Sequence, residues 1–449
     1  MIRRLAQLSG LVGAVFFLNG SVLAQATKSP DFDGNGRVDF DDFFLFADAF
    51  GARQGETRFN AKFDLSGNGV VDFDDFFLFA RDFGKTVSVQ PDLTDLRAYW
   101  SHGTCAGSGP VRYTVSPMAV EDIGAIIPLG VMVDAHVTPI DHQYYVPKDL
   151  NAGRYRYDVR APADGAIVHI QRRTVFVGDV SDPGKTTDDF RLVIEHSCTF
   201  WTYYDLITQL DKTILDQTGG EPSRMGPPTL TRIPVKAGQV IGKVGAQTLD
   251  IGTVNAEVTL PGFIVPAHYD REPWKIHTVD PFDFFDEPLK SQLLALNPRK
   301  VKPYGGRIDY DIDGRLVGNW FRENSNGYAG ASGDPRPWSG HLSVVYHHID
   351  TSKVVVSLGD FNGRSRQYFV KGNAPDPATV STATGPAKYE LIQMNLGQTG
   401  QVYNLDTTRV MGVILAQLVA DRKLKVEAFP DKSAASVTGF TSAARVYER

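Results

Sequence analysis

The sequence predicts a multidomain protein with a small helical module followed by mainly β structure. Three observations support this: a close internal repeat near the start with helical periodicity after each copy, many strand-like segments beyond it, and a length of 449 residues. Such a length suggests more than one core. We expect a signal segment at 1–26, the helical module at 27–86, a linker at 87–91, a barrel-like β domain at 92–300 and a second β-rich domain at 301–449.

The first residues have the pattern of a secretory signal peptide. Two arginines near the start precede an apolar stretch at 11–18, and a small-x-small site follows at 24–26. The stretch is shorter than the ~20 residues that a bilayer span needs. We therefore expect a secreted protein, extracellular or periplasmic, whose mature chain starts near Thr27 and keeps no membrane span.

The repeat carries the spacing of EF-hand calcium loops. Segments beginning at Phe32 and Leu65 are identical at 15 of 20 positions. Oxygen-bearing side chains recur at the alternate positions that face a calcium ion, with glycine at the tight turn and a backbone carbonyl at position 7. The sequence predicts two calcium ions, the second held more weakly because Ser66 replaces a carboxylate. The predicted ligands are Asp31, Asp33, Asn35, Arg37, Asp39 and Asp42 in the first loop, and Asp64, Ser66, Asn68, Val70, Asp72 and Asp75 in the second.

A short helix with an aromatic face is expected after each loop. The spacing is helical in both copies, and we expect the two faces to pack against each other as a small core. Gly51 and Gly84 are predicted helix stops. The residues of the two faces are Phe40, Phe43, Phe44, Ala47 and Phe50, and Phe73, Phe76, Phe77, Ala80 and Phe83.

This pair of loop-plus-helix units, without an entering helix, resembles the type I dockerin module over about 29–86. The resemblance implies calcium binding and docking to a protein partner. Loop positions 10 and 11 help dockerins to select a cohesin, and here they are Phe40-Asp41 and Phe73-Asp74 instead of hydroxyl or basic residues. The resemblance therefore carries calcium binding to this chain, but not cohesin binding.

The middle of the chain is predicted to be β-rich. Alternation and turn residues indicate strands, and helical signals are sparse, with 203–215 as the best helix candidate. The expected strands are 125–133, 155–161, 165–171, 191–195 and 239–244.

Three segments of this middle region resemble the lysostaphin-type (LytM-like) zinc metallopeptidases and their duplicated hybrid motif. They are His136-Val-Thr-Pro-Ile-Asp141-His142 with 159–168, Leu192-Val-Ile-Glu-His196 with 203–206, and 235–245 with 253–258. The resemblance spans about 125–290 and implies a metal site for which His136, Asp141 and His142 remain.

Other positions depart from the pattern of that family. Thr253 and Asn255 stand where its closing His-x-His would be, and Asp205 stands at a further histidine. Zinc therefore lacks an evident third protein ligand, and no catalytic residue can be assigned. Whether the domain is an enzyme stays open between a barrel retained for binding and a zinc hydrolase.

Cys105 and Cys198 are the two cysteines of the chain. After export, where oxidation is permitted, a disulfide between them is one interpretation. The other is a metal site that combines His102-x-x-Cys105 with His196-x-Cys198.

The last part of the chain gives further strand signals at 340–346, 354–358, 366–370 and 388–392. The run Asp309-x-Asp311-x-Asp313 begins like a calcium loop but lacks oxygen ligands later on. Strand alternation predicts that His347 and His348 point to opposite faces.

The net charge of -6 gives no basic surface for binding nucleic acid. Three functions remain as hypotheses. In the first hypothesis, a secreted calcium-binding protein carries a dockerin-like docking module attached to a non-catalytic metallopeptidase-like domain. In the second, the chain is a secreted zinc metallopeptidase acting on cell-wall peptide. In the third, it is a dockerin-bearing enzyme of polysaccharide catabolism.

Overall fold

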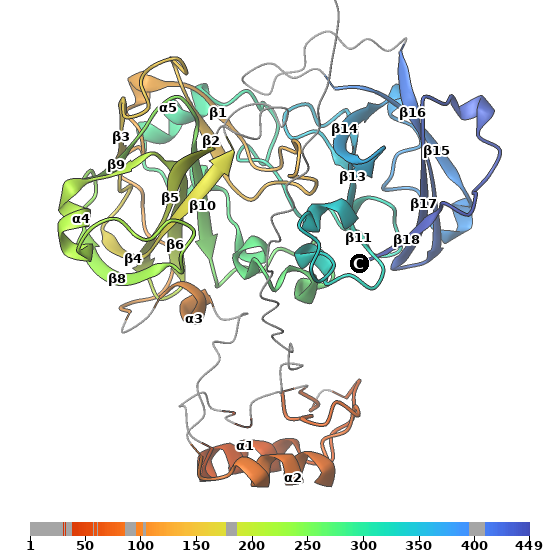
Figure 1. The fold of residues 1–449 in the computed structure, drawn as a ribbon, viewed down its shortest axis with the longest axis horizontal. Coiled ribbons are helices and arrows are strands. Elements are labelled where there is room, and N and C mark those ends of the chain that lie inside the picture. The colour runs from red at the N-terminus through yellow and green to blue at the C-terminus, as the bar shows by residue number, and fades with distance from the viewer. Residues whose placement is uncertain are drawn as a thin grey trace, which may run out of the picture. The chain divides into compact units, whose positions relative to one another are not determined.

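The computed structural model describes residues 30, 32, 38–56, 58–60, 62–85, 96–101, 105–176, 186–394 and 409–449. The chain divides into two compact units, Met1–Pro91 and Asp92–Arg449 (Figure 1). The predicted signal segment, His102 and four predicted ligands of the first calcium loop lie outside the described residues; these ligands are Asp31, Asp33, Asn35 and Arg37. Among the helices that are described, none has the length and apolar character needed to cross a bilayer.

The N-terminal unit is built from two equivalent helices, α1 (Phe40–Ala49) and α2 (Phe73–Asp82). Asp72 caps α2 by accepting the amide of Asp74, and Asp75 accepts the amide of Asp72 in return, which is a reciprocal capping box. Gly51 and Gly84 follow the helices with φ of 82° and 81°, a left-handed conformation that glycine adopts without strain. Both glycines therefore end the helices as the sequence predicted.

Backbone hydrogen bonds link the two copies of the repeat to each other. The amide of Val38 donates to the carbonyl of Lys85, and the amide of Gly84 donates to the carbonyl of Val38. In the equivalent place, Val71 exchanges backbone hydrogen bonds with Gly51 and Ala52. Each loop is thus paired with the segment that follows the helix of the other copy.

The core of this unit uses only part of the aromatic face that the sequence predicted, because Phe43, Phe50 and Phe76 pack against it. Phe46 and Phe79 are buried and their rings are stacked, with centroids 5.9 Å apart. The predicted packing of the two aromatic faces is confirmed only in part, because nearly every turn of both helices carries aromatics and periodicity alone does not choose between their sides. The residues that point to solvent instead are Phe40, Phe44, Ala47, Phe73, Phe77, Ala80 and Phe83.

The second unit begins with a two-sheet arrangement, here named the sheet lobe (residues 96–300). A seven-stranded antiparallel sheet has the order β1-β2-β10-β6-β5-β4-β8, and a three-stranded sheet has the order β3-β9-β7. Both sheets contribute side chains to one hydrophobic core. The strands are β1 (Ile123–Ile127), β2 (Gln143–Pro147), β3 (Tyr157–Arg160), β4 (Gly165–Phe176), β5 (Thr186–Ser197), β6 (Phe200–Ile207), β7 (Gln209–Leu210), β8 (Thr229–Val235), β9 (Val240–Val244) and β10 (Leu249–Asn255).

The central strands β6 and β10 are buried on both faces. Their second face is covered by a Trp-rich cluster to which Trp100 of helix α3 (Leu96–Trp100), Trp201 and Trp274 contribute. The remaining helices of the lobe are α4 (Lys212–Thr218) and α5 (Leu289–Ala295).

Two expectations for this lobe differ from the structure. The predicted helix 203–215 is wrong: β6 and β7 occupy most of it, because the β-branched and aromatic side chains of β6 fit a strand buried on both faces. Helix α4 begins only after Asp211, which caps it. The predicted barrel-like arrangement is instead the two separate sheets, since β9 pairs with β3 and β7 and not with the larger sheet.

The closed barrel lies in the rest of the unit, here named the barrel lobe (residues 301–449). Eight strands follow one another around it, and β11 pairs with β18 to close the ring. The predicted second β-rich region is confirmed. The strands are β11 (Gly318–Arg322), β12 (His341–Tyr346), β13 (Val354–Phe361), β14 (Arg364–Val370), β15 (Ala387–Gln393), β16 (Val410–Ala420), β17 (Lys423–Pro430) and β18 (Arg445–Glu448).

The two lobes are joined by a backbone bridge and by side-chain contacts, most of them at the loop between β1 and β2. Leu129 forms a β-bridge with Gly306. The Gln367 side chain accepts the amide of Asp134 and donates to its carbonyl, and the Arg299 guanidinium donates to the carbonyl of His348. These contacts fix the β1–β2 loop between the lobes.

Candidate functional site

The second predicted calcium loop is folded around its own carboxylates. Asp64 accepts the amides of Gly67, Asn68 and Gly69 at 2.8 to 3.1 Å. Asp75, at the end of the loop, accepts the amide of Ser66 at 2.7 Å. The chain therefore curls so that the first and last carboxylates lie on the same loop, as the EF-hand spacing requires.

The first loop is described only in part. Asp42 accepts the amides of Phe32 and Asp39, and this second contact matches the one between Asp75 and Asp72 in the other copy. The equivalent ends of the two loops are thus built alike. Oxygen-bearing side chains that could hold an ion among the residues described here are Asp39, Asp42, Asp64, Ser66, Asn68, Asp72 and Asp75, with the Val70 carbonyl.

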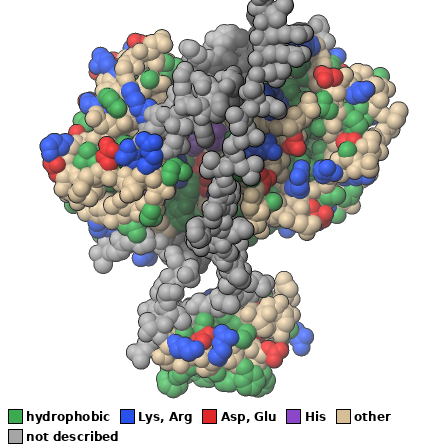
Figure 2. Space-filling model, in the orientation of Figure 1, with side chains coloured by type: hydrophobic (Ala, Val, Ile, Leu, Met, Phe, Trp, Pro, Cys, Tyr) green, Lys and Arg blue, Asp and Glu red, His purple; other side chains and the backbone are tan. Residues whose placement is uncertain are grey.

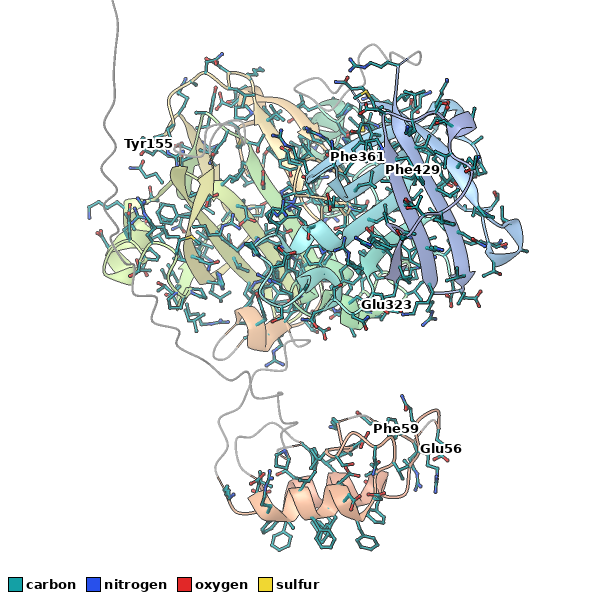
Figure 3. The ribbon with its side chains drawn as sticks, turned by 45° about the vertical axis from the view of Figure 1, so that its right-hand side comes forward. Glu56, Phe59, Tyr155, Glu323, Phe361 and Phe429 are labelled. Atoms are coloured by element: carbon teal, nitrogen blue, oxygen red, sulfur yellow. A yellow bond between two sulfur atoms is a disulfide. The ribbon has the colours of Figure 1, made fainter. Side chains whose placement is uncertain are left out.

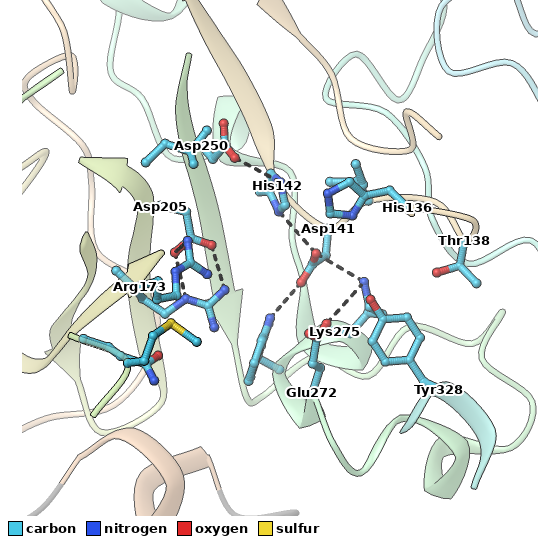
Figure 4. A pocket seen from close by; sticks show the side chains of 16 residues that line it. His136, Thr138, Asp141, His142, Arg173, Asp205, Asp250, Glu272, Lys275 and Tyr328 are labelled. Carbon is cyan, nitrogen blue, oxygen red and sulfur yellow. Dashed lines mark hydrogen bonds and ion pairs between the residues drawn. The ribbon is translucent and has the colours of Figure 1, made fainter. Parts of the chain in front are cut away.

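A pocket of about 490 Å³ lies in the second unit (Figure 4). Its wall comes from the β1–β2 loop, from β4, β5, β6 and β10 of the large sheet, from the turn η3 (Pro273–His277) and from the barrel lobe through Tyr328. The lining residues that carry its chemistry are His136, Thr138, Asp141, His142, Gln171, Arg173, Arg191, Asp205, Asp250, Glu272, Trp274, Lys275 and Tyr328.

One chain of charged side chains crosses the pocket. His142 lies between two carboxylates, with Nδ1 3.4 Å from Asp141 Oδ1 and Nε2 3.5 Å from Asp250 Oδ2. Beyond Asp141, the Lys275 ammonium is 3.2 Å from Asp141 Oδ1 and 3.9 Å from Glu272 Oε2. Figure 4 shows this sequence of contacts from Asp250 to Glu272. An internal cation therefore neutralises the central carboxylate.

Asp141 is held on both oxygens. Its Oδ2 accepts the indole N–H of Trp274 at 2.7 Å, while Oδ1 faces Lys275 and His142. Burial alone would raise the pKa of Asp141, but the charges of Lys275 and His142 outweigh it and hold this pKa well below its usual range. Asp141 is thus a charged, fully engaged side chain.

A second ion cluster lies on the strands. Asp205 receives a bidentate pair of hydrogen bonds from Arg191, at 2.8 and 2.7 Å, and a contact from Arg173 at 3.0 Å. Burial opposes ionisation of Asp205, but the two guanidinium groups lower its pKa strongly. Arg191 is therefore paired with Asp205, and Arg173 lies between Asp205 and Asp189, whose Oδ1 is 3.5 Å away.

Asp250 and Glu272 are the carboxyl groups of the pocket with raised pKa values. Burial and the charge of Asp205 raise the pKa of Asp250 to about 7, against the opposing effect of His142. Burial also raises the pKa of Glu272. Burial lowers the pKa of His142, but Asp141 and Asp250 reverse the shift and raise it. Asp250 and His142 can thus exchange a proton near neutral pH.

The structure brings the three predicted metal residues to one pocket. The His136 ring lies 6.3 Å from the His142 ring. His136 keeps solvent-accessible surface at the pocket, yet the protein atoms around it and the charges of His142 and Lys275 lower its pKa to about 4. Thr253 and Asn255 are buried and are not among the lining residues; Thr253 lies 3.1 Å from the Tyr113 hydroxyl.

Sequence reasoning missed Asp250, Lys275 and the contribution of the barrel lobe. Asp250 lies three residues before Thr253, opposite Asp205 in the β10–β6 pairing. An acidic residue between the apolar residues Leu249 and Ile251 was the signal that could have revealed it. Lys275, which is 3% exposed at its side chain, is a buried lysine that the sequence does not distinguish from a surface one.

The other predicted sites have structural partners. Cys105 and Cys198 form a disulfide with Cα atoms 5.2 Å apart. In the run that begins like a calcium loop, Asp311 lies 3.5 Å from Arg449, and Asp313 pairs with Arg422 on the surface.

The expectation that strand alternation separates His347 from His348 is wrong. β12 ends at Tyr346, so both histidines follow the strand and alternation does not apply to them. Their ring centroids lie 4.3 Å apart.

Among the described residues, no group of three or more His, Cys, Asp or Glu side chains is arranged to hold a metal ion. No protein-family model matches the chain, and a search of curated proteins finds no significant match.

Proposed function

We propose that the chain is a secreted calcium-binding protein that docks to a protein partner through its N-terminal module. The β-rich second unit would then hold a ligand in its pocket without cleaving it. The observation that carries the docking part is the set of aromatic side chains on the outer side of α1 and α2.

These aromatics form a repeated apolar surface, here named the Phe face (Phe40, Phe44, Phe73 and Phe77). Their side chains are 62% to 65% exposed. Figure 3 shows aromatic rings that project from one side of the helical module. Hydrophobic side chains gather on the corresponding side of the module in Figure 2. An exposed apolar patch of this kind is typical of a protein interaction site. The exposed carboxylate of Asp74 at its border favours a partner with an apolar groove and a basic rim.

Docking can be tested with the full mature chain in calcium. The double variant Phe44→Asp with Phe77→Asp should lose calcium-dependent retention on the envelope fraction of the producing cells and lose the protein that is cross-linked to the wild type. Leu230→Asp, at a position 47% exposed in the second unit, is the matched control and should keep both. Retention by the double variant would show that the Phe face is not the docking surface.

The state of Asp141 supports binding rather than metal catalysis. Both of its oxygens are occupied by Trp274, Lys275 and His142, so a metal ion would have to displace the Lys275 ammonium. A charged lysine beside a would-be metal carboxylate opposes a second cation there by direct repulsion.

A secreted zinc peptidase is the second candidate, and one distance favours it. The 3.5 Å between His142 Nε2 and Asp250 Oδ2 is close to the spacing of two ligands on a tetrahedral zinc ion, and Asp141 on Nδ1 would orient the ring. A further nitrogen donor in the same pocket is His136, whose ring lies 6.3 Å from that of His142. These residues do not make a complete ligand set, so we derive no reaction step from zinc.

Zinc analysis separates the two candidates. The binding proposal predicts no stoichiometric zinc after dialysis of the full chain in zinc-containing buffer and no cleavage of peptidoglycan. One zinc ion per chain, lost in Asp250→Ala, together with cleavage that is abolished by His136→Ala, would overturn it.

A further inference from the structure

The pocket continues into a second cavity. This cavity, of about 240 Å³, shares four lining residues with the first, which are His136, Thr138, Glu272 and Tyr328. The two cavities therefore lie next to each other, and together they are named here the groove, with two compartments. The second compartment is also lined by Ala135, Val137, Arg271, Pro337, Trp338 and His341. A ligand that fills the groove must therefore be longer than one compartment.

The two compartments differ in chemistry. The first holds the carboxylates and cations described above, which suit a ligand rich in hydrogen-bonding groups. The second holds the barrel-lobe aromatics Tyr328, Trp338 and His341, from the turns η5 (Gly327–Ala329) and η6 (Pro337–Gly340) and the start of β12. The Tyr328 and His341 rings stack at 5.2 Å with a 25° angle between their planes. The barrel lobe thus supplies flat apolar surfaces next to a polar site.

The backbone around the groove does not suit an extended peptide. Peptides commonly bind by adding a strand to a free sheet edge. The edge strands of the large sheet are β1 and β8, and none of the lining residues belongs to them. The lining strand residues lie on β4, β5, β6, β10 and β12, which have neighbours on both sides. Recognition in the described part of the groove therefore falls to side chains.

Paired polar side chains beside aromatic rings suit a sugar chain. A pyranose ring offers hydroxyl groups at its edge, which carboxylates and amides bind, and a C–H face, which an aromatic ring can cover. The position of Glu272 and Tyr328 in both compartments places a polar group and a ring where consecutive sugars would meet.

The charges favour a sugar with amino groups over an acidic sugar. Arg191 is paired with Asp205, Arg173 lies between Asp205 and Asp189, and Lys275 lies between Asp141 and Glu272. Asp250 shares the His142 ring with Asp141 and accepts a hydrogen bond from the Thr248 hydroxyl at 3.0 Å. A ligand ammonium at Asp250 would give this carboxyl group a cation that it does not share, whereas a ligand carboxylate would meet cations that already face carboxylates of the protein.

We infer that the groove binds a linear glycan of amine-bearing sugars. One sugar lies against Asp250 and Glu272, and a neighbouring sugar lies against Tyr328 and Trp338. The inference rests on the binding function proposed for the pocket, and it gives the barrel lobe the role of completing that site.

The test is isothermal titration of the full mature chain, in calcium and near neutral pH, with four probes. These are the hexamers of glucosamine, N-acetylglucosamine and galacturonic acid, and tetra-alanine as the peptide. We expect the glucosamine hexamer to bind, the N-acetylated hexamer to bind at least about tenfold more weakly, and the other two not to bind.

Variants assign the binding to the groove. Trp338→Ala and Asp250→Asn should each weaken binding of the glucosamine hexamer by about tenfold or more. Tyr155→Ala, on an exposed residue at the far side of the sheet lobe (Figure 3), should leave it unchanged. Melting temperatures equal to that of the wild type show that a loss is not due to unfolding; Trp338→Phe gives a milder second variant, which should restore most of the affinity.

The outcomes separate this inference from the function on which it rests. Binding of tetra-alanine, or equal binding of the acidic and amine-bearing hexamers, overturns the glycan inference but keeps a binding pocket. Unchanged affinity in both Trp338→Ala and Asp250→Asn overturns the groove as the site. Zinc-dependent cleavage of any probe overturns the non-catalytic function itself.

Discussion

Buried carboxylates are stabilised by different groups in the two units. In the N-terminal module, Asp64 and Asp75 are held by backbone amides of their own loop. In the pocket of the second unit, Asp141 and Asp205 are held by side-chain cations, Lys275 and the two arginines. Backbone amides bring partial charge only, while ammonium and guanidinium groups bring a full charge. The proposed calcium ions would thus bring a full charge to the module from outside, whereas the pocket already contains side-chain cations.

The first prediction removes that internal cation. Lys275→Met should destabilise the second unit by about 3–5 kcal/mol, because it leaves the buried Asp141 without its charge partner. The measurement is the free energy of unfolding in urea. Lys212→Met, at a lysine whose side chain is 82% exposed and paired with Asp216, is the control and should cost less than about 1 kcal/mol. Equal losses in the two variants would contradict the internal role of Lys275.

The second prediction removes the external cation. Chelation of calcium should raise hydrogen exchange across residues 62–85 and leave the second unit unchanged, as followed by mass spectrometry. A site saturated at ~100-fold its Kd contributes about 2.7 kcal/mol to the folded state. Asp64→Asn should reduce the calcium effect on the second loop, whereas Asp216→Asn on the exposed helix α4 should not. If chelation loosened both units alike, the contrast between them would fail.

The third prediction concerns pH. The pKa of Asp250 is about 7 in the folded chain, and an unfolded aspartate has a pKa of about 3.9. Between these values the folded state keeps a proton that the unfolded state has released, so this group makes stability fall as pH rises from about 4 to about 7. Asp250→Asn should remove that slope, which amounts to about 4 kcal/mol over the window. The charged groups facing Asp250 are His142, Asp205 and Arg173, which are intact in the variant.

Its control is Asp286→Asn, at a carboxylate whose side chain is 48% exposed. Urea unfolding of both variants at several pH values gives the slope of the free energy of unfolding against pH. An unchanged slope in Asp250→Asn would mean that Asp250 ionises normally in the folded protein.

The fourth prediction has the smallest effect. Phe44→Ala with Phe77→Ala should change the stability of the calcium-loaded module by less than about 0.5 kcal/mol per residue, because both side chains are already in water. Phe46→Ala, in the buried stack, should cost about 3–5 kcal/mol. The stability losses of both variants are measured by thermal unfolding, followed through hydrogen exchange in residues 38–85. A large loss in the exposed pair would show that these rings support the fold rather than a partner surface.

Sequence patterns predicted the helix ends and strand segments that residues close together in the chain determine. Gly51 and Gly84 end the helices where expected, and the segments of β12 to β15 were found because short-range alternation and turns define them. The side of α1 that is buried was not predictable in the same way. Phe43, Phe44 and Phe46 present rings to both sides, so the contact with α2 makes the choice.

The site was predictable only where it is contiguous in the chain. His136, Asp141 and His142 were identified together because one loop carries them all. Asp250 reaches His142 through the pairing of β10 with β2, and Lys275 arrives from a turn far along the sequence. Strand order is a property of the whole sheet. The family pattern, in which Thr253 and Asn255 replace the closing histidines, therefore did not point to Asp250.

The crossed pairing of the two repeat copies bears on how the module would respond to a protease. Val38 is held by Gly84 and Lys85, and Val71 by Gly51 and Ala52. A single cut between the copies would yield two peptides, each containing a complete loop and helix but lacking the backbone partner of its own loop. Such halves should reassociate as a noncovalent pair in the presence of calcium, and neither should fold in isolation.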